Sequence, residues 1–419
     1  MTNGWLTAQN LPLRSLQRLF RSWTARQEIR LRPVTSCQMA MCGFVDLVNM
    51  LGPVKQANAS VPDMRVAIAG GGTGGHIIPA LAIAGELKSA HDAEILFIGT
   101  PRGLESRLVP QAGYPLSLIE VGQLKNVSLL TQARTLFDLP LSLIRCRKLL
   151  HDFHPNVVIG VGGYASGPAM GAAILGGIPT LAFEPNAFPG LANRLVGKRV
   201  DAAAVNFAAA AKYFRNAQIT GIPVRDEFFR LMPRPAAAPP HLLVFGGSQG
   251  ARILNTLLPQ IASSLLTAVP GLTILHQAGA RHADATLAAY QAGNAPHDRW
   301  QVHAFLDDMP RRFEAADLVL SRSGASTVAE LAAAGKPSLL IPFPQAADDH
   351  QRKNAEALAE AGAATVLLEA RLTPEILLQT LIGLLKNRPA LERMSAQAHT
   401  LAHSDATSRI AAMAIELAR

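Results

Sequence analysis

Residues 64–88 form the stretch that most limits how this chain can fold. Residues 66–69 are a short uncharged run, typical of a buried parallel strand, and five glycines follow before residue 76. Beyond Pro79, apolar residues recur at helical spacing. The pattern predicts a strand, a glycine turn and a helix. Such a turn lets a ligand approach the backbone and leaves amide N–H groups at a helix N-terminus, where anions are stabilised.

The turn at residues 70–75 matches the fingerprint Gly-x-Gly-x-x-Gly of dinucleotide-binding proteins, but a lone match is weak evidence. An NAD enzyme places an acidic residue near the end of its second strand. Here the predicted second strand, residues 94–99, is followed by residues 100–102, Thr-Pro-Arg, which argues against a nicotinamide cofactor. His76 follows the turn at once, and it is either a reactive group or a side chain that packs the turn.

Composition restricts the class of protein and of partner. A chain of 419 residues is too long for one ordinary core, so we expect two domains. The net charge is +9, but only 5% of residues are aromatic and no run of Lys and Arg supports a nucleic-acid partner. Nucleotide sugars and acidic lipid surfaces remain open as anionic partners. Cys37, Cys42 and Cys146 show neither metal-ligand nor disulfide spacing, which indicates a reducing compartment.

The first 63 residues differ from the rest of the chain. They carry seven Lys and Arg against three Asp and Glu, and an apolar face around Leu16 and Trp23. Such a face can lie on a membrane surface, although the segment lacks the continuous apolar stretch of a signal peptide. The alternative, which we favour, is a loose extension translated from a start codon upstream of Met64, because Met64 directly precedes the first strand.

Two later stretches are strongly apolar. Residues 123–153 predict a helical region with an apolar face and flanking cations. It is either a surface that a monotopic protein presents to an anionic leaflet or, as we favour, a core-facing helix with a solvated basic side. Residues 157–183 carry no charged side chain, but glycines and prolines break them into strand, turn, helix, turn and strand, so we reject a transmembrane span.

A proline-rich linker at residues 231–240 precedes a second half in which the pattern restarts. Residues 241–245 predict a strand, residues 246–252 a glycine turn, and residues 253–266 a helix. This repetition of the first half indicates two similar Rossmann-like lobes that face one cleft.

A later strand, residues 318–322, leads into another helix start. Ser323 is expected to be the N-cap residue, and Ser326 and Thr327 offer hydroxyls and amides in the first turn. Glu330 follows one turn later, where its carboxylate either favours the helix dipole or holds a ribose diol.

Seven motifs, in this order along the chain, make the sequence similar to the family of peptidoglycan glycosyltransferases that add N-acetylglucosamine to lipid I, which makes lipid II. They are GGTGGH, GGYASGP, EPN, GIPVR, GGSQGARILN, SRSGASTVAE and DDHQRKNA. Each glycine turn is weak evidence alone, whereas the ordered combination is specific. The resemblance begins at Met64, extends to about the C-terminus, and excludes the leading extension.

The resemblance implies an α/β glycosyltransferase B fold with two Rossmann-like lobes facing a cleft. The expected division is a basic extension (1–63), an acceptor and membrane lobe (64–230), a linker (231–240), a donor lobe (241–400) and a C-terminal helix that returns to the first lobe (401–419). The implied partners are UDP-GlcNAc, lipid I and the cytoplasmic leaflet of the cell membrane, bound peripherally. No cofactor and no nucleic acid are implied.

The family's nucleotide-sugar site corresponds, by resemblance, to Thr73, Gly74, Gly75, Asn186, Arg225, Ser248, Leu306, Ala325, Ser326, Thr327, Val328, Ala329, Glu330 and Gln351. The implied roles are diphosphate binding (Ser248), ribose binding (Glu330), a border to the uracil (Leu306 and Arg225) and contact with the sugar (Gln351 and Asn186). Tyr164 and Ser166 are expected to line the acceptor side. The sequence departs from the family's usual His-Glu-Gln-Asn at Phe183 and Pro185, and Leu306 replaces a common isoleucine.

An inverting transfer needs a base on the acceptor hydroxyl and stabilisation of the departing diphosphate. His76 resembles the family's proposed base or acceptor-side residue. Our hypothesis is that it takes the proton of the muramyl 4-hydroxyl, with Glu184 as the second candidate. No Asp-x-Asp triplet occurs in the chain. We therefore expect no metal to hold the diphosphate, and backbone amides at helix N-termini to bind it instead.

Three other functions stay open. A nicotinamide oxidoreductase rests on the first glycine turn alone. A related lipid glycosyltransferase would make galactolipids or another glycolipid, and a non-catalytic module would bind the sugar nucleotide without turnover. Transfer assays that compare UDP-GlcNAc with UDP-galactose on a lipid I analogue distinguish these functions.

Overall fold

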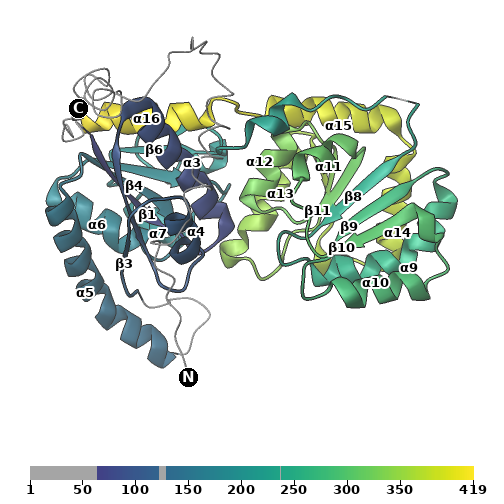
Figure 1. Ribbon diagram of the computed structural model, residues 1–419, viewed down its shortest axis with the longest axis horizontal. Coiled ribbons are helices and arrows are strands. Elements are labelled where there is room, and N and C mark those ends of the chain that lie inside the picture. The colour runs from purple at the N-terminus through teal and green to yellow at the C-terminus, as the bar shows by residue number, and fades with distance from the viewer. Residues whose placement is uncertain (1–63, 122–128, 236) are drawn as a thin grey trace, which may run out of the picture. The chain divides into compact units, whose positions relative to one another are not determined.

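The protein is described from a computed structural model that covers residues 64–121, 129–235 and 237–419, without the side chains of residues 129–139. The chain folds into two parallel sheets flanked by helices, which confirms the predicted α/β class with two Rossmann-like lobes (Figure 1). The interpretations of residues 1–63 lie outside the described residues.

Within the described residues, the first sheet has seven strands in the order β3-β2-β1-β4-β5-β6-β7. Val66 of β1 pairs with Ile95 of β2 on one side and with Val157 of β4 on the other. Both faces of these central strands are covered, which is why their sequences are continuous apolar runs. The strands are β1 (Arg65–Gly70), β2 (Glu94–Gly99), β3 (Leu116–Leu118), β4 (Val157–Gly162), β5 (Thr180–Glu184), β6 (Ala202–Val205) and β7 (Ala217–Ile219).

The helices of the first lobe are α3 (Gly74–His91), α4 (Glu105–Gln111), α5 (Leu129–Phe153), α6 (Ser166–Gly176), α7 (Leu191–Val196) and α8 (Ala208–Ala211), followed by the short η1 (Asp226–Arg230). As predicted, residues 157–183 contain a strand, a helix and a strand. β3 is only three residues long. β3 is an outermost strand with a partner on one side only, so few ladder hydrogen bonds define its ends. No helix of the described ranges is long and apolar enough to cross a membrane.

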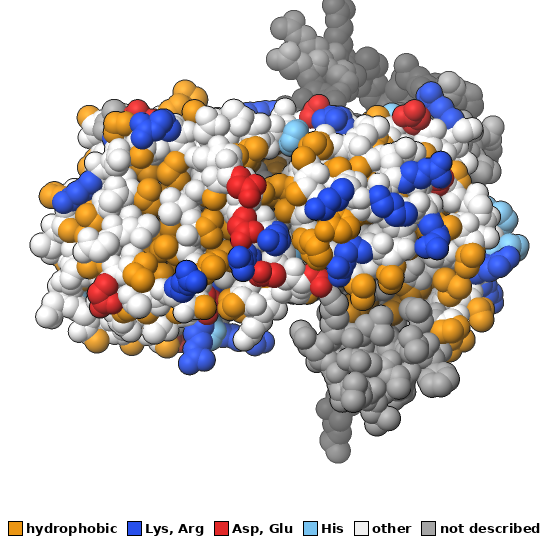
Figure 2. All heavy atoms as spheres, turned by 180° about the vertical axis from the view of Figure 1, so that it is seen from behind, with side chains coloured by type: hydrophobic (Ala, Val, Ile, Leu, Met, Phe, Trp, Pro, Cys, Tyr) orange, Lys and Arg blue, Asp and Glu red, His pale blue; other side chains and the backbone are white. Residues whose placement is uncertain are grey.

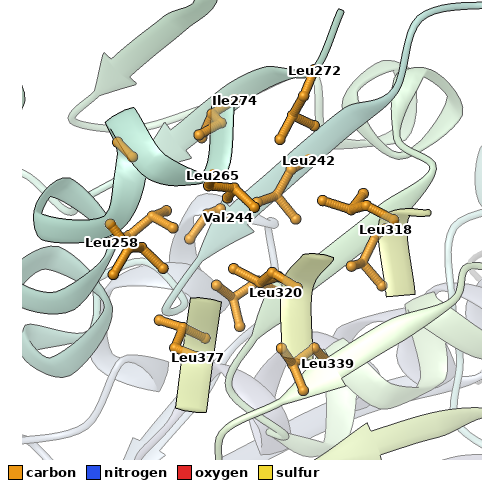
Figure 3. Close-up of a cluster of buried hydrophobic side chains, with 14 of the residues drawn as sticks. Leu242, Val244, Leu258, Leu265, Leu272, Ile274, Leu318, Leu320, Leu339 and Leu377 are labelled. Carbon is orange, nitrogen blue, oxygen red and sulfur yellow. The ribbon is translucent and has the colours of Figure 1, made fainter. Parts of the chain in front are cut away.

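The second sheet has six strands among the described residues, in the order β10-β9-β8-β11-β12-β13. Leu242 of β8 packs with Leu258 of α9 (Arg252–Ala268) and Leu377 of α14 (Pro374–Leu385) in one buried cluster (Figure 3). The helix predicted over residues 253–266 is observed as α9 and is slightly longer. The strands are β8 (His241–Phe245), β9 (Thr273–Gln277), β10 (Trp300–His303), β11 (Leu318–Ser321), β12 (Ser338–Leu340) and β13 (Ala364–Val366).

The helices that follow β8 are α9 (Arg252–Ala268), α10 (Ala283–Ala292), α11 (Met309–Ala315), α12 (Ala325–Ala333), α13 (His350–Glu360), α14 (Pro374–Leu385), α15 (Arg388–Thr400) and α16 (Ala406–Ala418), with η2 (His297–Arg299), η3 (Ala347–Asp349) and η4 (Glu369–Arg371) between them. α15 packs in the second lobe, whereas α16 packs against α3, β4 and β5 of the first (Figure 1). Ile410 and Met413 of α16 join the buried cluster that holds Val66. The domain boundaries drawn from the sequence stay predictions.

Each sheet contains a point where the strand order reverses. In the first sheet, β2 and β3 lie on one side of β1, and β4 begins the series of strands on the other side. In the second sheet, β9 and β10 lie on one side of β8, and β11 begins the series on the other side. Open α/β sheets bind ligands at such points, outside the carboxyl ends of the strands. The loops there include the glycine turns that the sequence analysis singled out, after β1, β4 and β8, and the start of α12 after β11.

Candidate active site

The first glycine turn connects β1 to α3. Residues 70–72 have φ values of 140°, 141° and 90°, which favour glycine. A Cβ on Gly70 would lie 2.1 Å from the carbonyl oxygen of Gly162, so the turn runs directly over the end of β4. Thr73, the N-cap residue of α3, makes no capping hydrogen bond with its side chain, so the first amides of the helix can donate to an anion. The three residues predicted to bind the donor here, Thr73, Gly74 and Gly75, lie at this helix start.

His76 lies in the first turn of α3, with its imidazole against Gly162. A Cβ at Gly162 would come within 2.8 Å of His76 Cε1, so glycine leaves room for the ring. Nδ1 of His76 is buried and has no hydrogen-bond partner within the described part of the chain. Burial lowers the pKa of His76 below 6.5, hydrogen bonding to the Val161 backbone raises it, and nearby His350 lowers it. The imidazole is therefore neutral at neutral pH.

Glu105 supports this turn from α4, and the sequence analysis did not find it. Its buried carboxylate accepts hydrogen bonds from the Gly72 N–H at 2.6 Å and from the N–H and hydroxyl of Thr100 at 3.0 and 2.9 Å. A Cβ on Gly103 would lie 1.9 Å from this carboxylate. Glu105 thus ties the turn after β1 to the end of β2. The only local signal is an acidic residue in the first turn of a helix, a feature that many helices share.

Glu184 ends β5 and is only 1% exposed. Its Oε1 accepts hydrogen bonds from the backbone and side-chain amides of Asn186, at 2.9 and 3.1 Å. Its Oε2 accepts from the Gly190 N–H at 3.1 Å and from the Asn193 side chain at 3.0 Å. Burial raises the pKa of Glu184, and these hydrogen bonds lower it. Because four donors already occupy the two oxygens, this geometry favours a role in shaping the loop after β5.

The two predicted acceptor-side residues differ in exposure. Tyr164 is 46% exposed in the turn after β4. Ser166 begins α6 and is buried, and a Cβ on Gly160 of β4 would lie 2.8 Å from its Oγ. The arrangement favours Tyr164 over Ser166 for contact with an acceptor, and both assignments stay predictions.

In the second lobe, the glycine turn after β8 lies beside the start of α12, because β8 and β11 are paired. Ser248 is exposed in that turn. The predicted cap at Ser323 is wrong: Gly324 is the N-cap residue, and the Ser323 hydroxyl donates to the Gln351 carbonyl oxygen at 2.8 Å. Gly324 has no side chain that could accept from the amides that open α12. The residues predicted to bind the donor here all lie in α12: Ala325, Ser326, Thr327, Val328, Ala329 and Glu330.

Glu330 combines a poorly solvated carboxylate with a nearby cation. Burial raises the pKa of Glu330 to about 7, while the charge of Arg225 lowers it. The residue as a whole is half-buried, so a ligand can still reach it. Arg225 is exposed just before η1, with its guanidinium carbon 5.1 Å from the centre of the Phe228 ring. Leu306, the other residue predicted to border the uracil, is 3% exposed after β10.

Gln351 lies in the first turn of α13, and its Oε1 accepts a hydrogen bond from the Phe343 N–H at 3.0 Å. Arg322 holds the segment that carries Phe343. Its buried guanidinium donates to the carbonyl oxygens of the two residues before Phe343, at 3.0 Å each, and pairs with Glu369 at 2.7 Å. The position of Gln351 thus depends on a buried arginine to which the sequence analysis gave no role of its own.

Asn354 joins the two lobes, and the sequence analysis, which contains it in the motif DDHQRKNA, gave it no role. It is fully buried on α13 and accepts a hydrogen bond from the Ala187 N–H at 2.8 Å. It donates to the Asn186 side-chain oxygen at 3.1 Å and to the Ser323 carbonyl oxygen at 3.2 Å. Asn186 is therefore linked to the helix that carries Gln351. No local pattern reveals a contact between residues 167 positions apart.

Models of two family domains match the chain: the glycosyltransferase family 28 N-terminal domain over residues 66–205 and the C-terminal domain over residues 241–410. The chain belongs to glycosyltransferase family 28. A protein of Anaeromyxobacter dehalogenans (strain 2CP-C) is similar to this family 28 chain. The two are 42% identical over 361 residues, which cover 85% of this chain and 94% of that protein. A protein of Solibacter usitatus (strain Ellin6076) is 41% identical over 354 residues, 84% of this chain and 96% of its own length.

Both relatives of the family 28 chain are named UDP-N-acetylglucosamine--N-acetylmuramyl-(pentapeptide) pyrophosphoryl-undecaprenol N-acetylglucosamine transferase. Among solved structures, the crystal structure of Acinetobacter baumannii MurG superposes with a TM-score of 0.72 at 32% identity, covering 84% of this chain and 99% of that one. The family resemblance inferred from the seven motifs is confirmed.

The departure at Phe183 has a packing explanation in this family 28 chain. Phe183 is fully buried in the cluster that contains Val66 and Ile410, so its ring packs the first lobe and offers nothing to a substrate. The Pro185 carbonyl oxygen accepts a hydrogen bond from the Asn206 side chain at 3.3 Å. The loop after β5 is therefore held in place without the usual histidine and glutamine.

Proposed function

We infer that this chain transfers N-acetylglucosamine from UDP-GlcNAc to the 4-hydroxyl of the MurNAc residue of lipid I, which produces lipid II. The observation that carries this inference is the 42% identity, over 85% of the chain, to a protein named for this transfer. The two Rossmann-like lobes and their four loops at the strand-order reversals supply a site of the required kind.

The proposed donor site consists of the loops at these reversals. Uncapped amides at the start of α12 and in the turn around Ser248 bind the diphosphate. The Ser326 hydroxyl is buried without a hydrogen-bond partner in the described chain, which suits contact with a phosphate oxygen. Glu330 accepts from the ribose hydroxyls, and the uracil lies by Leu306 and Arg225. Asn186 and Gln351 contact the sugar.

His76 is the proposed general base. Burial lowers the pKa of His76, which favours the neutral imidazole. A neutral imidazole can take the proton of the acceptor hydroxyl as the bond to the sugar forms. The absence of an Asp-x-Asp triplet from the sequence supports binding of the departing diphosphate by amides, without a metal.

The test is a transfer assay with radiolabelled UDP-GlcNAc or UDP-galactose and a lipid I analogue, each with and without EDTA. We expect label from UDP-GlcNAc in the lipid product, little from UDP-galactose, and no loss with EDTA. Preference for galactose would identify another lipid-directed glycosyltransferase. Binding of UDP-GlcNAc without turnover would identify a sugar-binding module, and inhibition by EDTA would contradict the metal-free mechanism.

The first lobe is also proposed to bind the cytoplasmic leaflet peripherally, through α5 and α6. Leu141 and Ile144 of α5 are 48% and 63% exposed, and Leu175 of the adjoining α6 is 67% exposed. Arg145, Arg147 and Lys148 are exposed beside them. On the face seen in Figure 2, basic and hydrophobic side chains lie intermixed over the half that contains the first sheet. Such a surface suits an anionic membrane.

Replacing Leu141 and Ile144 by serine should weaken sedimentation with anionic phospholipid vesicles about tenfold, because two apolar side chains no longer enter the interface. The control is Ile376→Ser, which changes a 41% exposed residue on α14 of the second lobe. Transfer to a water-soluble acceptor should be unchanged in all three proteins. Equal vesicle binding by the double variant and the control would contradict the proposed surface.

A further inference from the structure

Gln277 is the last residue of β9, 3% exposed, and both ends of its side-chain amide are occupied. Nε2 donates to the Gly247 carbonyl oxygen at 3.1 Å. Oε1 accepts from the Leu306 N–H at 2.8 Å. The amide therefore connects two loops that are 59 residues apart in sequence (306 − 247).

The sheet order explains why Gln277 reaches both loops. β9 lies between β8 and β10. The glycine turn follows β8 and the segment that contains Leu306 follows β10. Parallel strands end at the same edge of a sheet, so the last residue of the middle strand lies between the two loops.

The segment after Gln277 forms the support of the glycine turn. A Cβ on Gly250 would lie 1.8 Å from the Ala278 carbonyl oxygen, and a Cβ on Gly279 would lie 2.3 Å from the Gln249 carbonyl oxygen. Both glycines have positive φ, 75° and 86°. The backbones of the two segments are thus in direct contact, which only glycine permits at these positions.

His276 and Asn255 hold the segment after Gln277 in place. The Asn255 side chain on α9 donates to the Ala278 carbonyl oxygen at 2.9 Å, and its oxygen lies 3.0 Å from Nε2 of the fully buried His276. α9 begins directly after the glycine turn. The turn, the helix that follows it and the end of β9 therefore form one hydrogen-bonded unit.

We propose that Gln277 is a positioning residue that holds the diphosphate turn and the uracil-side loop at the separation that one uridine diphosphate spans. This rests on the proposed function, which assigns Ser248 to the diphosphate and Leu306 to the uracil. Holding both loops in place before the ligand arrives removes part of the entropic cost of binding. The amide of Gln277 supplies one donor and one acceptor here. An ionised glutamate cannot donate to Gly247, and methionine forms neither bond.

The test compares Gln277→Met with Gln301→Met, the same substitution at an exposed residue of the neighbouring strand β10. Calorimetry measures the binding of UDP and of uridine, and kinetics give KM and kcat for UDP-GlcNAc. For Gln277→Met we expect the affinity for UDP to fall about tenfold, because two buried hydrogen bonds are lost. The KM for UDP-GlcNAc should rise by about the same factor. Uridine contacts only one of the two loops, so its affinity should change much less. The kcat at saturating donor should stay near the wild-type value.

Gln277→Glu is the second variant. It keeps the acceptor for the Leu306 N–H but faces the Gly247 carbonyl with a carboxylate oxygen. As for Gln277→Met, we expect the affinity for UDP to fall more than the affinity for uridine. Equal losses for UDP and uridine, or UDP affinity unchanged in both variants, would overturn the proposal. If the wild-type chain failed to bind UDP at all, the proposed function itself would be wrong, and the two failures are thus distinguishable.

Discussion

Replacing His76 by asparagine should lower kcat for lipid II formation by roughly 10²–10⁴-fold, the range that a positioned general base contributes. Asparagine keeps a polar side chain against Gly162 but cannot take a proton. KM for UDP-GlcNAc should stay close to the wild-type value, because the base acts on the acceptor. Steady-state kinetics with a lipid I analogue measure both quantities. His91→Asn, at the exposed end of the same helix, is the control.

The pH profile tests the same role independently. The base must be neutral to work, and burial lowers the pKa of His76 below 6.5. The acid limb of the kcat profile of the wild-type enzyme should therefore lie at lower pH than the ordinary pKa of histidine would place it, and this limb should be missing from His76→Asn. A variant with near-wild-type kcat would exclude His76 as the base, and Glu184→Gln would then test the second candidate.

Replacing Glu330 by glutamine should raise KM for UDP-GlcNAc roughly 10- to 100-fold, because hydrogen bonds to a charged group contribute about 1.5–3 kcal/mol. Glutamine preserves the size of the side chain but removes the charge that accepts the two ribose hydroxyls. The effect should fall mainly on KM, since the ribose is remote from the bond that breaks. Glu360→Gln, at an exposed position of α13, is the matched control and should leave KM unchanged.

The affinity for the donor should also depend on pH in the wild-type enzyme. Burial raises the pKa of Glu330 to about 7, so the carboxylate is ionised above this value and protonated below it. KM for UDP-GlcNAc should rise as the pH falls through 7, whereas the KM of Glu330→Gln should be flat over that range. A wild-type KM that is independent of pH around 7 would show that the ionised carboxylate does not bind the donor.

Most of the fold was predictable from local patterns. The patterns of residues 66–69 and 157–183 predict their strands and turns, because a buried parallel strand is a continuous apolar run and glycine is typical of turns. The prediction that Ser323 caps its helix failed, because the Ser323 hydroxyl bonds to the Gln351 carbonyl oxygen instead. Here a partner 28 residues away in the sequence determines the local structure.

The residues of the candidate site also fall into two groups, those that a local pattern predicts and those that it does not. The residues proposed to touch the substrates lie in recognisable turns and helix starts, so a motif can find them. Glu105 and Gln277, which hold those turns in place, lie outside the seven motifs, and Asn354 lies inside the motif DDHQRKNA without any sign of the contact that it makes. Their roles depend on partners 33, 29 and 167 residues away, respectively.

By itself, the amino-acid sequence determined the strands, the glycine turns and the helix starts of this protein, because backbone freedom and apolar periodicity act within a few residues. Only the tertiary structure decided which buried amides and carboxylates brace those turns. The reason is physical: a buried polar group must find a partner wherever the chain brings one, and strand order, not sequence distance, sets where that is.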